Sequence, residues 1–221
     1  MKYVPVLDKG FRPMYAEFKK YSEEAAKTEN KLLKICVERN DGYNYIYEYK
    51  IFANGHKDEN NLMAERIVKT ILWLVGGYKI YLAGDENVYE FIKAAYTDKG
   101  IRAFDKNFME RVYEKPFEVI MCDEKNFPKE KKCSLSVGGH LDGCRIGFDA
   151  GGSDRKVSAV IDGKVVYSEE VIWFPKINSD PDYHYNEILT ALKTAASKMP
   201  RVDAIGVSSA GVYVNNKIMV A

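Results

Sequence analysis

The chain has 221 residues, of which 46% are hydrophobic and 29% charged, a composition typical of a globular protein with a packed core. Its 33 Lys and Arg residues nearly balance 32 Asp and Glu residues, so a net charge of +1 leaves no overall basic field for a polyanion. The longest apolar run, residues 71–75, is far shorter than the roughly 20 residues of a membrane helix. The N-terminus also lacks the apolar core of a signal peptide, so we expect a cytoplasmic protein that does not bind membranes.

The first 125 residues alternate helical and strand patterns, which predicts a mixed α/β segment. An amphipathic helix is expected at 13–29, and a hairpin at 32–52 around the turn Asn40-Asp41-Gly42. A helix should begin at Asn60 and end at Gly76-Gly77. Further elements are expected in this order: a strand running to Gly84, helices at 86–96 and 104–114, and a strand at 116–123. The polar stretch 126–143 is the best candidate boundary, and it divides domains at 1–140 and 141–221.

Four cysteines are expected to be reduced thiols in a cytoplasmic protein. Cys133, His140 and Cys144 fall within one short segment, which raises the alternative of a zinc site. Their spacing matches no CxxC-type knuckle, and a further ligand would have to come from elsewhere. Loop residues with cysteines near strand ends are therefore the favoured interpretation.

The second half begins with three apolar runs over 144–170, and a helix at 184–198 follows them, ended by Pro200. The sequence RVDAIGVSSAGVYVNNKIMVA then predicts strand, Ser/Gly turn and strand. The last apolar run has no later run to pair with, so we expect a fragment of a longer protein. The order hairpin, helix, strand also occurs at 32–84, and either a weak internal duplication or a coincidence of common α/β patterns explains it.

The first turn of this half has the composition of a metal–phosphate site. IGFDAGGS ends a strand with Asp149 and then places Gly151, Gly152 and Ser153 in the turn. Glycines permit positive φ and let backbone amides approach an anion closely, while the serine adds a hydroxyl donor. The acid favours phosphate only through a divalent cation or water, and Lys156 could add positive charge. A plain hairpin turn remains the alternative.

These residues, with AVIDGKVV and AIGVSSAGVYVNNKIMVA after them, resemble the opening of the actin-like/hexokinase (ASKHA, ribonuclease H-like) nucleotide-binding lobe. Within that superfamily the chain resembles the ROK family of sugar kinases and repressors. Asp149, Gly151, Gly152 and Ser153 match its DxGGT turn, with Ser in place of Thr. The segment at 204–221 matches its GIGxPGxxD motif, although Ser-Ala precedes Gly211 where Pro is frequent and no acid follows. The resemblance covers 143–221.

The resemblance implies that the turn at 149–153 receives the phosphates of ATP, with Asp149 acting through Mg²⁺. Ser208, Ser209 and Gly211 would lie toward a sugar-binding cleft. The catalytic Asp that follows Asn in this family has no match before residue 221, so we expect the fragment to be inactive and its parent to be an ATP- and Mg²⁺-dependent sugar kinase. The alternatives are a ROK-type transcriptional regulator of the N-acetylglucosamine-repressor kind, or a degenerate ASKHA binding protein. A homo-oligomer is compatible with each of these functions.

Residues 61–96 superficially resemble the helix-turn-helix module of such a regulator. The second helical pattern, ENVYEFIKAAY, offers acids and aromatics in place of side chains that read base edges, and KIYLAGD has a strand pattern. We therefore expect a packed α/β segment here and no DNA binding through it. The tyrosines at positions 43, 45, 47 and 49 alternate along one strand, which favours a sheet face under a helix over a stacking platform.

Overall fold

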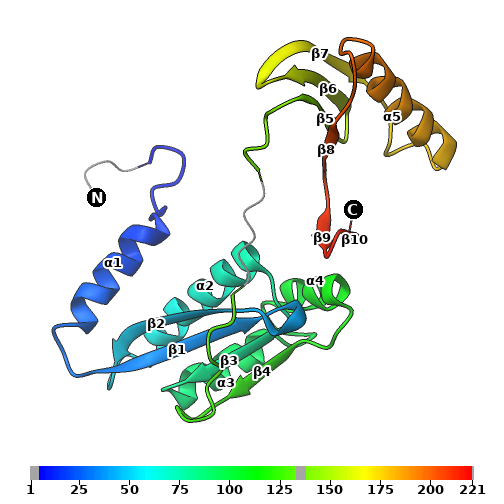
Figure 1. Ribbon diagram of the computed structural model, residues 1–221. Coiled ribbons are helices and arrows are strands. Elements are labelled where there is room, and N and C mark those ends of the chain that lie inside the picture. Colours follow the sequence, from blue (N-terminus) through cyan, green and yellow to red (C-terminus); the bar gives the residue numbers. More distant parts are fainter. Residues whose placement is uncertain (1–4, 133–137, 221) are drawn as a thin grey trace. The chain divides into compact units, whose positions relative to one another are not determined.

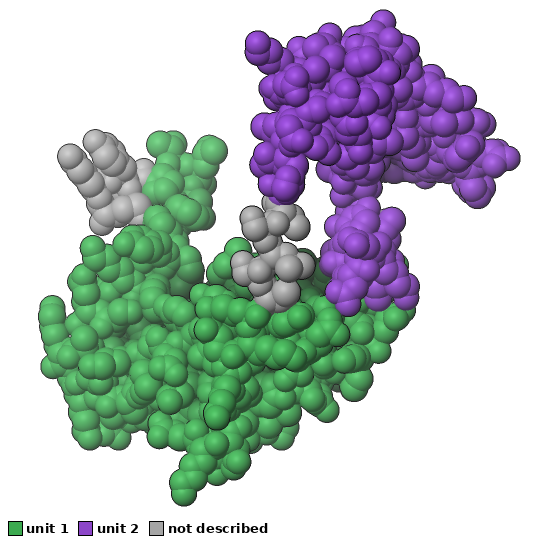
Figure 2. All heavy atoms as spheres, in the orientation of Figure 1, with its two compact units in different colours: residues 1–134 green, residues 135–221 purple. Residues whose placement is uncertain are grey.

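The structure is a computed structural model, and it describes residues 5–132 and 138–220. The chain divides into two compact units, residues 1–134 and 135–221, coloured separately in Figure 2. Each unit combines a mixed sheet with helices, so the predicted α/β class with mixed sheets and flanking helices is confirmed. Within the described ranges, no helix is long and apolar enough to cross a membrane.

Unit 1 contains four helices, four strands and a short 3-10 turn among its described residues (Figure 1). In chain order they are α1 (Met14–Ala25), β1 (Asn30–Glu38), η1 (Asn40–Gly42), β2 (Asn44–Phe52), α2 (Lys57–Val75), β3 (Lys79–Ala83), α3 (Glu86–Ala95), α4 (Ala103–Tyr113) and β4 (Glu118–Met121). The strand order is β2-β1-β3-β4. Because β1 is antiparallel to both β2 and β3, and β4 is parallel to β3, the carboxyl ends of β2, β3 and β4 meet at one edge.

The core of unit 1 lies on the face of the sheet that α2 and α3 cover. Strand alternation places one side of β1 and β3 on that face, where side chains are fully buried: Leu33, Ile35, Val37, Ile80 and Leu82. Apolar residues at helical spacing on α2 and α3 pack against them: Ala64, Val68, Leu72, Val88 and Ile92. Local propensity and burial therefore agree along this unit, which explains why its elements could be predicted.

The start of α2 differs from the prediction, because the helix begins at Lys57 and not at Asn60. Asn60 is buried, and its side-chain amide donates to the Phe52 carbonyl over 2.9 Å and accepts from the Tyr21 hydroxyl over 2.6 Å. It therefore joins α1, β2 and α2 from inside the first turn. The predicted end at Gly76 is confirmed, with φ at 74°.

Residues 61–96 do not form a helix-turn-helix. The segment KIYLA is β3, hydrogen-bonded between β1 and β4 in the sheet, so a strand separates α2 from α3. This helix–strand–helix arrangement is the packed α/β segment that we expected.

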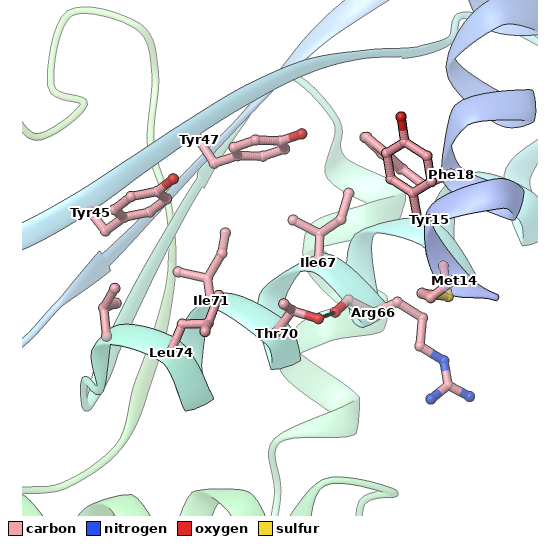
Figure 3. Close-up of a pocket in the computed structure, with 11 residues that line it drawn as sticks. Met14, Tyr15, Phe18, Tyr45, Tyr47, Arg66, Ile67, Thr70, Ile71 and Leu74 are labelled. Atoms are coloured by element: carbon pink, nitrogen blue, oxygen red, sulfur yellow. Dashed lines mark hydrogen bonds between the residues drawn. The ribbon is translucent and has the colours of Figure 1, made fainter.

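An apolar groove of about 400 Å³ lies between α1, α2 and β2 in unit 1. Figure 3 shows Tyr45 and Tyr47 of β2 facing Ile67 and Ile71 of α2 across it, while Thr70 bonds back to the Arg66 carbonyl. Tyr49, two residues further along the same strand face, is buried against Phe18 and Tyr21 of α1. The alternating tyrosines therefore form a sheet face that helices cover in large part.

Unit 2 is built on the second sheet, which has the order β7-β6-β5-β8. Its elements are β5 (Cys144–Ala150), β6 (Asp154–Ile161), β7 (Lys164–Ile172), α5 (Pro181–Ala196), β8 (Ala204–Ser209), β9 (Val212–Val214) and β10 (Lys217–Val220). The first three strands form an antiparallel meander, α5 follows, and β8 returns parallel to β5 (Figure 1). This is the expected order of strand, turn, strand, turn, strand, helix and strand.

A hairpin followed by a helix and a strand occurs in both units, but the returning strand runs in different directions. In unit 1 the strand after the helix, β3, lies antiparallel to β1, whereas in unit 2 the strand after the helix, β8, lies parallel to β5. The difference arises because unit 2 has a third strand before its helix, which reverses the direction in which the chain re-enters the sheet.

Candidate functional site

The sheet of unit 2 brings together the two motifs that the sequence analysis singled out. Asp149 near the end of β5 pairs in register with Ser208 near the end of β8, and the Ser208 hydroxyl donates to the Asp149 carboxylate over 2.6 Å. Since β5 and β8 are parallel neighbours, their carboxyl ends lie at the same edge of the sheet. The DAGGS turn and the start of the SSAG turn therefore share that edge.

Strand alternation decides which face of the sheet carries this pair. Ile146 and Phe148 point toward Ala191 and Ala195 of α5 and form the core of unit 2. Asp149 therefore points to the opposite face, which leaves its carboxylate accessible.

Two bonds from Trp173, a buried residue just after β7, hold the turn between β5 and β6. Its indole N–H donates to the Gly151 carbonyl over 2.8 Å, and its backbone amide donates to the Ser153 carbonyl over 3.2 Å. The carbonyls of Gly151 and Ser153 therefore both accept hydrogen bonds from Trp173. No sequence motif pointed to Trp173.

The glycines of the turn do not supply the positive φ that we predicted for them. Neither Gly151 nor Gly152 has φ in the left-handed region, so positive φ is not what requires them. At Gly151 an added Cβ would lie 2.5 Å from the Asp154 carbonyl oxygen, which is closer than real Cβ atoms approach. Close approach of the backbone to itself therefore requires glycine at 151.

Lys176 lies against the turn, whereas the lysine predicted to add charge there was Lys156. A Cβ on Gly152 would meet Lys176 Cε at 2.9 Å and Nζ at 3.2 Å, so the amine lies over the residue that has no side chain. Among the described residues, Lys176 forms no ion pair. Its loop is fixed in part by the Asn178 side chain, which donates to the Phe174 carbonyl over 2.8 Å.

Lys156, in contrast, is engaged with acids of its own sheet. Its amine bonds to the Asp154 carboxylate and lies 3.8 Å from that of Glu170. The bonds from Lys156 and from the Ser153 hydroxyl hold the pKa of Asp154 below its usual value, and the same Asp154 bond raises the pKa of Lys156. Lys156 thus stays charged, and much of its charge is balanced locally.

The turn has free donors that an anion could use. Among the described residues, the backbone amides of Gly152 and Ser153 have no hydrogen-bond acceptor, and the Lys176 amine stands beside them. Such successive amides form a concavity that binds anions. A magnesium ion fits this donor set, because Mg²⁺ bound with a phosphate needs only one or two carboxylates and keeps several waters. Asp149 has one oxygen bonded to Ser208 at the same sheet edge, but it does not line the pocket of about 280 Å³ that Gly152, Ser153, Trp173 and Lys176 form at the turn.

The remaining residues of the second motif follow Ser208 at the end of β8. The Ser209 hydroxyl donates to the Ala210 carbonyl over 3.3 Å, and Gly211 adopts φ of 124°, a conformation that side chains rarely take. Beyond them β9 and β10 form a short antiparallel hairpin around the Asn215-Asn216 turn. The geometry thus places Ser208 beside Asp149, and it does not test the sugar-cleft roles predicted for Ser208, Ser209 and Gly211.

The zinc alternative falls partly outside the described residues, because Cys133 is not among them. Cys144 is a buried, free cysteine at the start of β5, and Cys36 and Cys122 are free as well. No group of three or more metal-binding side chains occurs within 5–132 and 138–220.

Comparisons with known proteins identify no family for this chain. No family model matches the chain, and no curated protein matches it. Among solved structures, one likeness is to an exopolyphosphatase from Cytophaga hutchinsonii, with a TM-score of 0.24 and 12% sequence identity. The match covers 82% of this chain, which spans 64% of that chain's length. A TM-score this low supports no assignment of activity.

Proposed function

We propose that unit 2 binds the phosphate groups of a magnesium nucleotide at the turn between β5 and β6. The observation that carries this proposal is the Asp149–Ser208 bond, which joins two motifs of the expected phosphate lobe at one sheet edge. The free amides of Gly152 and Ser153, together with the Lys176 amine, supply donors for the phosphate oxygens. This arrangement is a phosphate-binding half-site.

Asp149, Ser208 and Trp173 would contribute to binding in different ways. Asp149 is held by Ser208 in an orientation that faces away from the α5 core, so it can position a hydrated Mg²⁺ and repels a bare phosphate. Trp173 fixes the turn by occupying its carbonyls, which leaves the amides as the groups that face a ligand. When bound, Mg²⁺ would neutralise phosphate charge, as it does in phosphoryl transfer generally.

The finer assignment rests on the resemblance of the DAGGS and GVSSAG segments to the ROK family. On that basis, we propose that the whole protein is an ATP-dependent sugar kinase and that residues 143–221 supply its phosphate and magnesium contacts. Positioning and charge stabilisation account for most of the catalysis of phosphoryl transfer, so a chain with contacts alone is expected to bind and not to turn over.

Calorimetric titration of the whole chain with a non-hydrolysable ATP analogue, with and without Mg²⁺, tests the proposal. We expect magnesium-dependent binding that weakens at least about tenfold in Asp149→Asn, which removes a charged ligand. Asp142→Asn is the matched control, because Asp142 is an exposed acid of the same unit whose side chain lies 3.4 Å from Arg145. Equal affinities of Asp149→Asn and the unmodified chain would exclude the phosphate assignment.

A further inference from the structure

A second candidate site lies in unit 1 and shares no residue with the proposed function. A polar pocket of about 210 Å³ occupies the carboxyl ends of β2 and β3, and the residues that matter here are Lys31, His56, Lys57, Asn61, Asp85 and Asn87. Its walls come from the β2–α2 and β3–α3 connections, with Lys31 of β1 between them. Crevices at the carboxyl ends of strands are where open α/β sheets bind ligands.

Asn61 gives the first independent sign of a ligand. It is only 5% exposed, and its side-chain oxygen has no hydrogen-bond partner among the described residues. Its neighbour Asn60 is equally buried, yet all of its side-chain bonds are made within the fold. A buried amide oxygen left without a hydrogen-bond partner costs about 1–3 kcal/mol. A fold that satisfies Asn60 and leaves Asn61 unpaired at a pocket points to a donor supplied from outside the chain.

The two helix N-termini at the pocket differ in how their amides are satisfied. On α3 the Asp85 carboxylate caps the helix by accepting from the Val88 amide over 2.8 Å. On α2, a helix of 19 residues, no side chain caps the first turn. The His56 ring instead bonds to Glu59 and stacks on Phe52. The uncapped amides carry the positive end of the helix dipole and favour a negative group.

Charged side chains add to this preference. Lys31 bonds to Asp85 over 2.5 Å, and the exposed amine of Lys57 stands at the start of α2. Two amines and one carboxylate leave one positive charge among the pocket residues, and neither Asp58 nor Glu59 lines the pocket. Lys57 and Asn61 are four residues apart, so they share a helix face, and helical side chains tilt back toward the N-terminus. The Asn61 amide therefore lies about one turn from the uncapped amides.

We propose that this pocket binds a small carboxylate with a hydrogen-bond donor on the adjacent carbon, the chemistry shared by α-amino acids and α-hydroxy acids. The carboxylate accepts from the first-turn amides of α2 and from Lys57. The adjacent ammonium or hydroxyl donates to the unpaired oxygen of Asn61. A volume of about 210 Å³ limits the ligand to a few heavy atoms beyond this group.

Calorimetric titration of the whole chain with lactate, alanine, acetate, inorganic phosphate and glycerol tests the ligand class. We expect lactate or alanine to bind at least about tenfold more tightly than acetate, which lacks the donor for Asn61. Preference between lactate and alanine identifies the hydroxyl or the ammonium as the natural donor. Equal binding of acetate, tighter binding of phosphate, binding of glycerol alone, or no binding at all would each overturn the proposal.

Two variants locate the site. Asn61→Leu should abolish lactate and alanine binding while raising the melting temperature of the free chain, because the unpaired amide is removed. Lys57→Met should weaken binding about tenfold, whereas Lys69→Met, a change of the same kind further along α2, should leave it unchanged. Lys57 is exposed, so this pair decides the question even if Asn61→Leu does not fold. Equal affinities of the two lysine variants would contradict the assignment.

Discussion

The Ser208 hydroxyl and the Asp149 carboxylate are joined by a hydrogen bond of 2.6 Å across 59 residues of sequence. The bond fixes the rotamer of the acid at the sheet edge where the two glycine-bearing turns lie. A carboxylate held in this way is oriented before any ligand arrives, so less side-chain entropy is lost on binding.

Removal of the serine should therefore weaken ligand binding through Asp149. We expect Ser208→Ala to lower magnesium-nucleotide affinity about five- to tenfold, and to have a much smaller effect when Asp149 is already Asn, because the two residues act as one unit. Calorimetry on the four chains of this double-mutant cycle measures the coupling. Additive effects of the two substitutions would show that the bond does not orient the acid.

The two lysines near the turn should differ in their contribution to phosphate binding. Lys176 lies over Gly152 without an acidic partner among the described residues, whereas Lys156 is paired with Asp154 and near Glu170. Lys176→Met should lower magnesium-nucleotide affinity about tenfold, and Lys156→Met by less than about threefold. Titration at two salt concentrations checks this, since the affinity lost with Lys176 should shrink at high salt. The reverse order would assign the phosphate contact to Lys156, as the sequence analysis expected.

Sequence reasoning reached most of the fold because local patterns and tertiary packing agree. The buried alternation of β1 and β3 and the apolar spacing of α2 are strong signals that no later contact overrides. The predicted beginning of α2 was wrong because Asn60 is of a residue type that often caps helices. Its side chain is instead used for bonds to Phe52 and Tyr21, which only the packed fold brings near.

The candidate site could be predicted only where its residues form a local motif. Asp149, Gly151, Gly152 and Ser153 lie within five residues and could be named from the sequence, whereas the pairing of Asp149 with Ser208 is visible only in the folded sheet. Trp173 and Lys176 reach the turn from the far end of β7, about 20 residues later. Their only sequence signal is their position just after a strand that ends beside the turn. The pocket around Asn61 carried no motif, because its residues come from three separate segments.

Arg155 should stabilise unit 2 more than any exposed arginine. Its side chain is 5% exposed on β6, and its guanidinium reaches Glu187 of α5 over 2.8 Å and Glu169 of β7 over 3.4 Å. Arg155→Met leaves two partly buried carboxylates without their cation, which should cost about 2–4 kcal/mol. Arg145→Met, in a more exposed pair with Asp142, should cost less than about 1 kcal/mol. In a Trp73→Phe background, tryptophan fluorescence comes from Trp173 and reports the urea unfolding of unit 2. Equal urea midpoints for Arg155→Met and Arg145→Met would contradict the prediction.

Glu110 should make unit 1 sensitive to acid. Burial raises the pKa of its carboxyl, but hydrogen bonds from Lys106 and from the Phe117 amide, both 2.8 Å long, outweigh burial and hold the pKa below its usual value. The folded chain therefore binds this proton less readily than the unfolded chain, so the stabilisation is complete above the ordinary glutamate pKa, about 4.3. It is lost as the pH falls through the lower pKa of the folded state. Glu110→Gln should reduce the free energy of unfolding at pH 7 and flatten its decline between about pH 5 and pH 3. Urea unfolding across this pH range measures both effects, with the exposed Glu23→Gln as the control. If the free energy of unfolding of Glu110→Gln declined in parallel with that of the unmodified chain, Glu110 would not contribute to the loss of stability in acid.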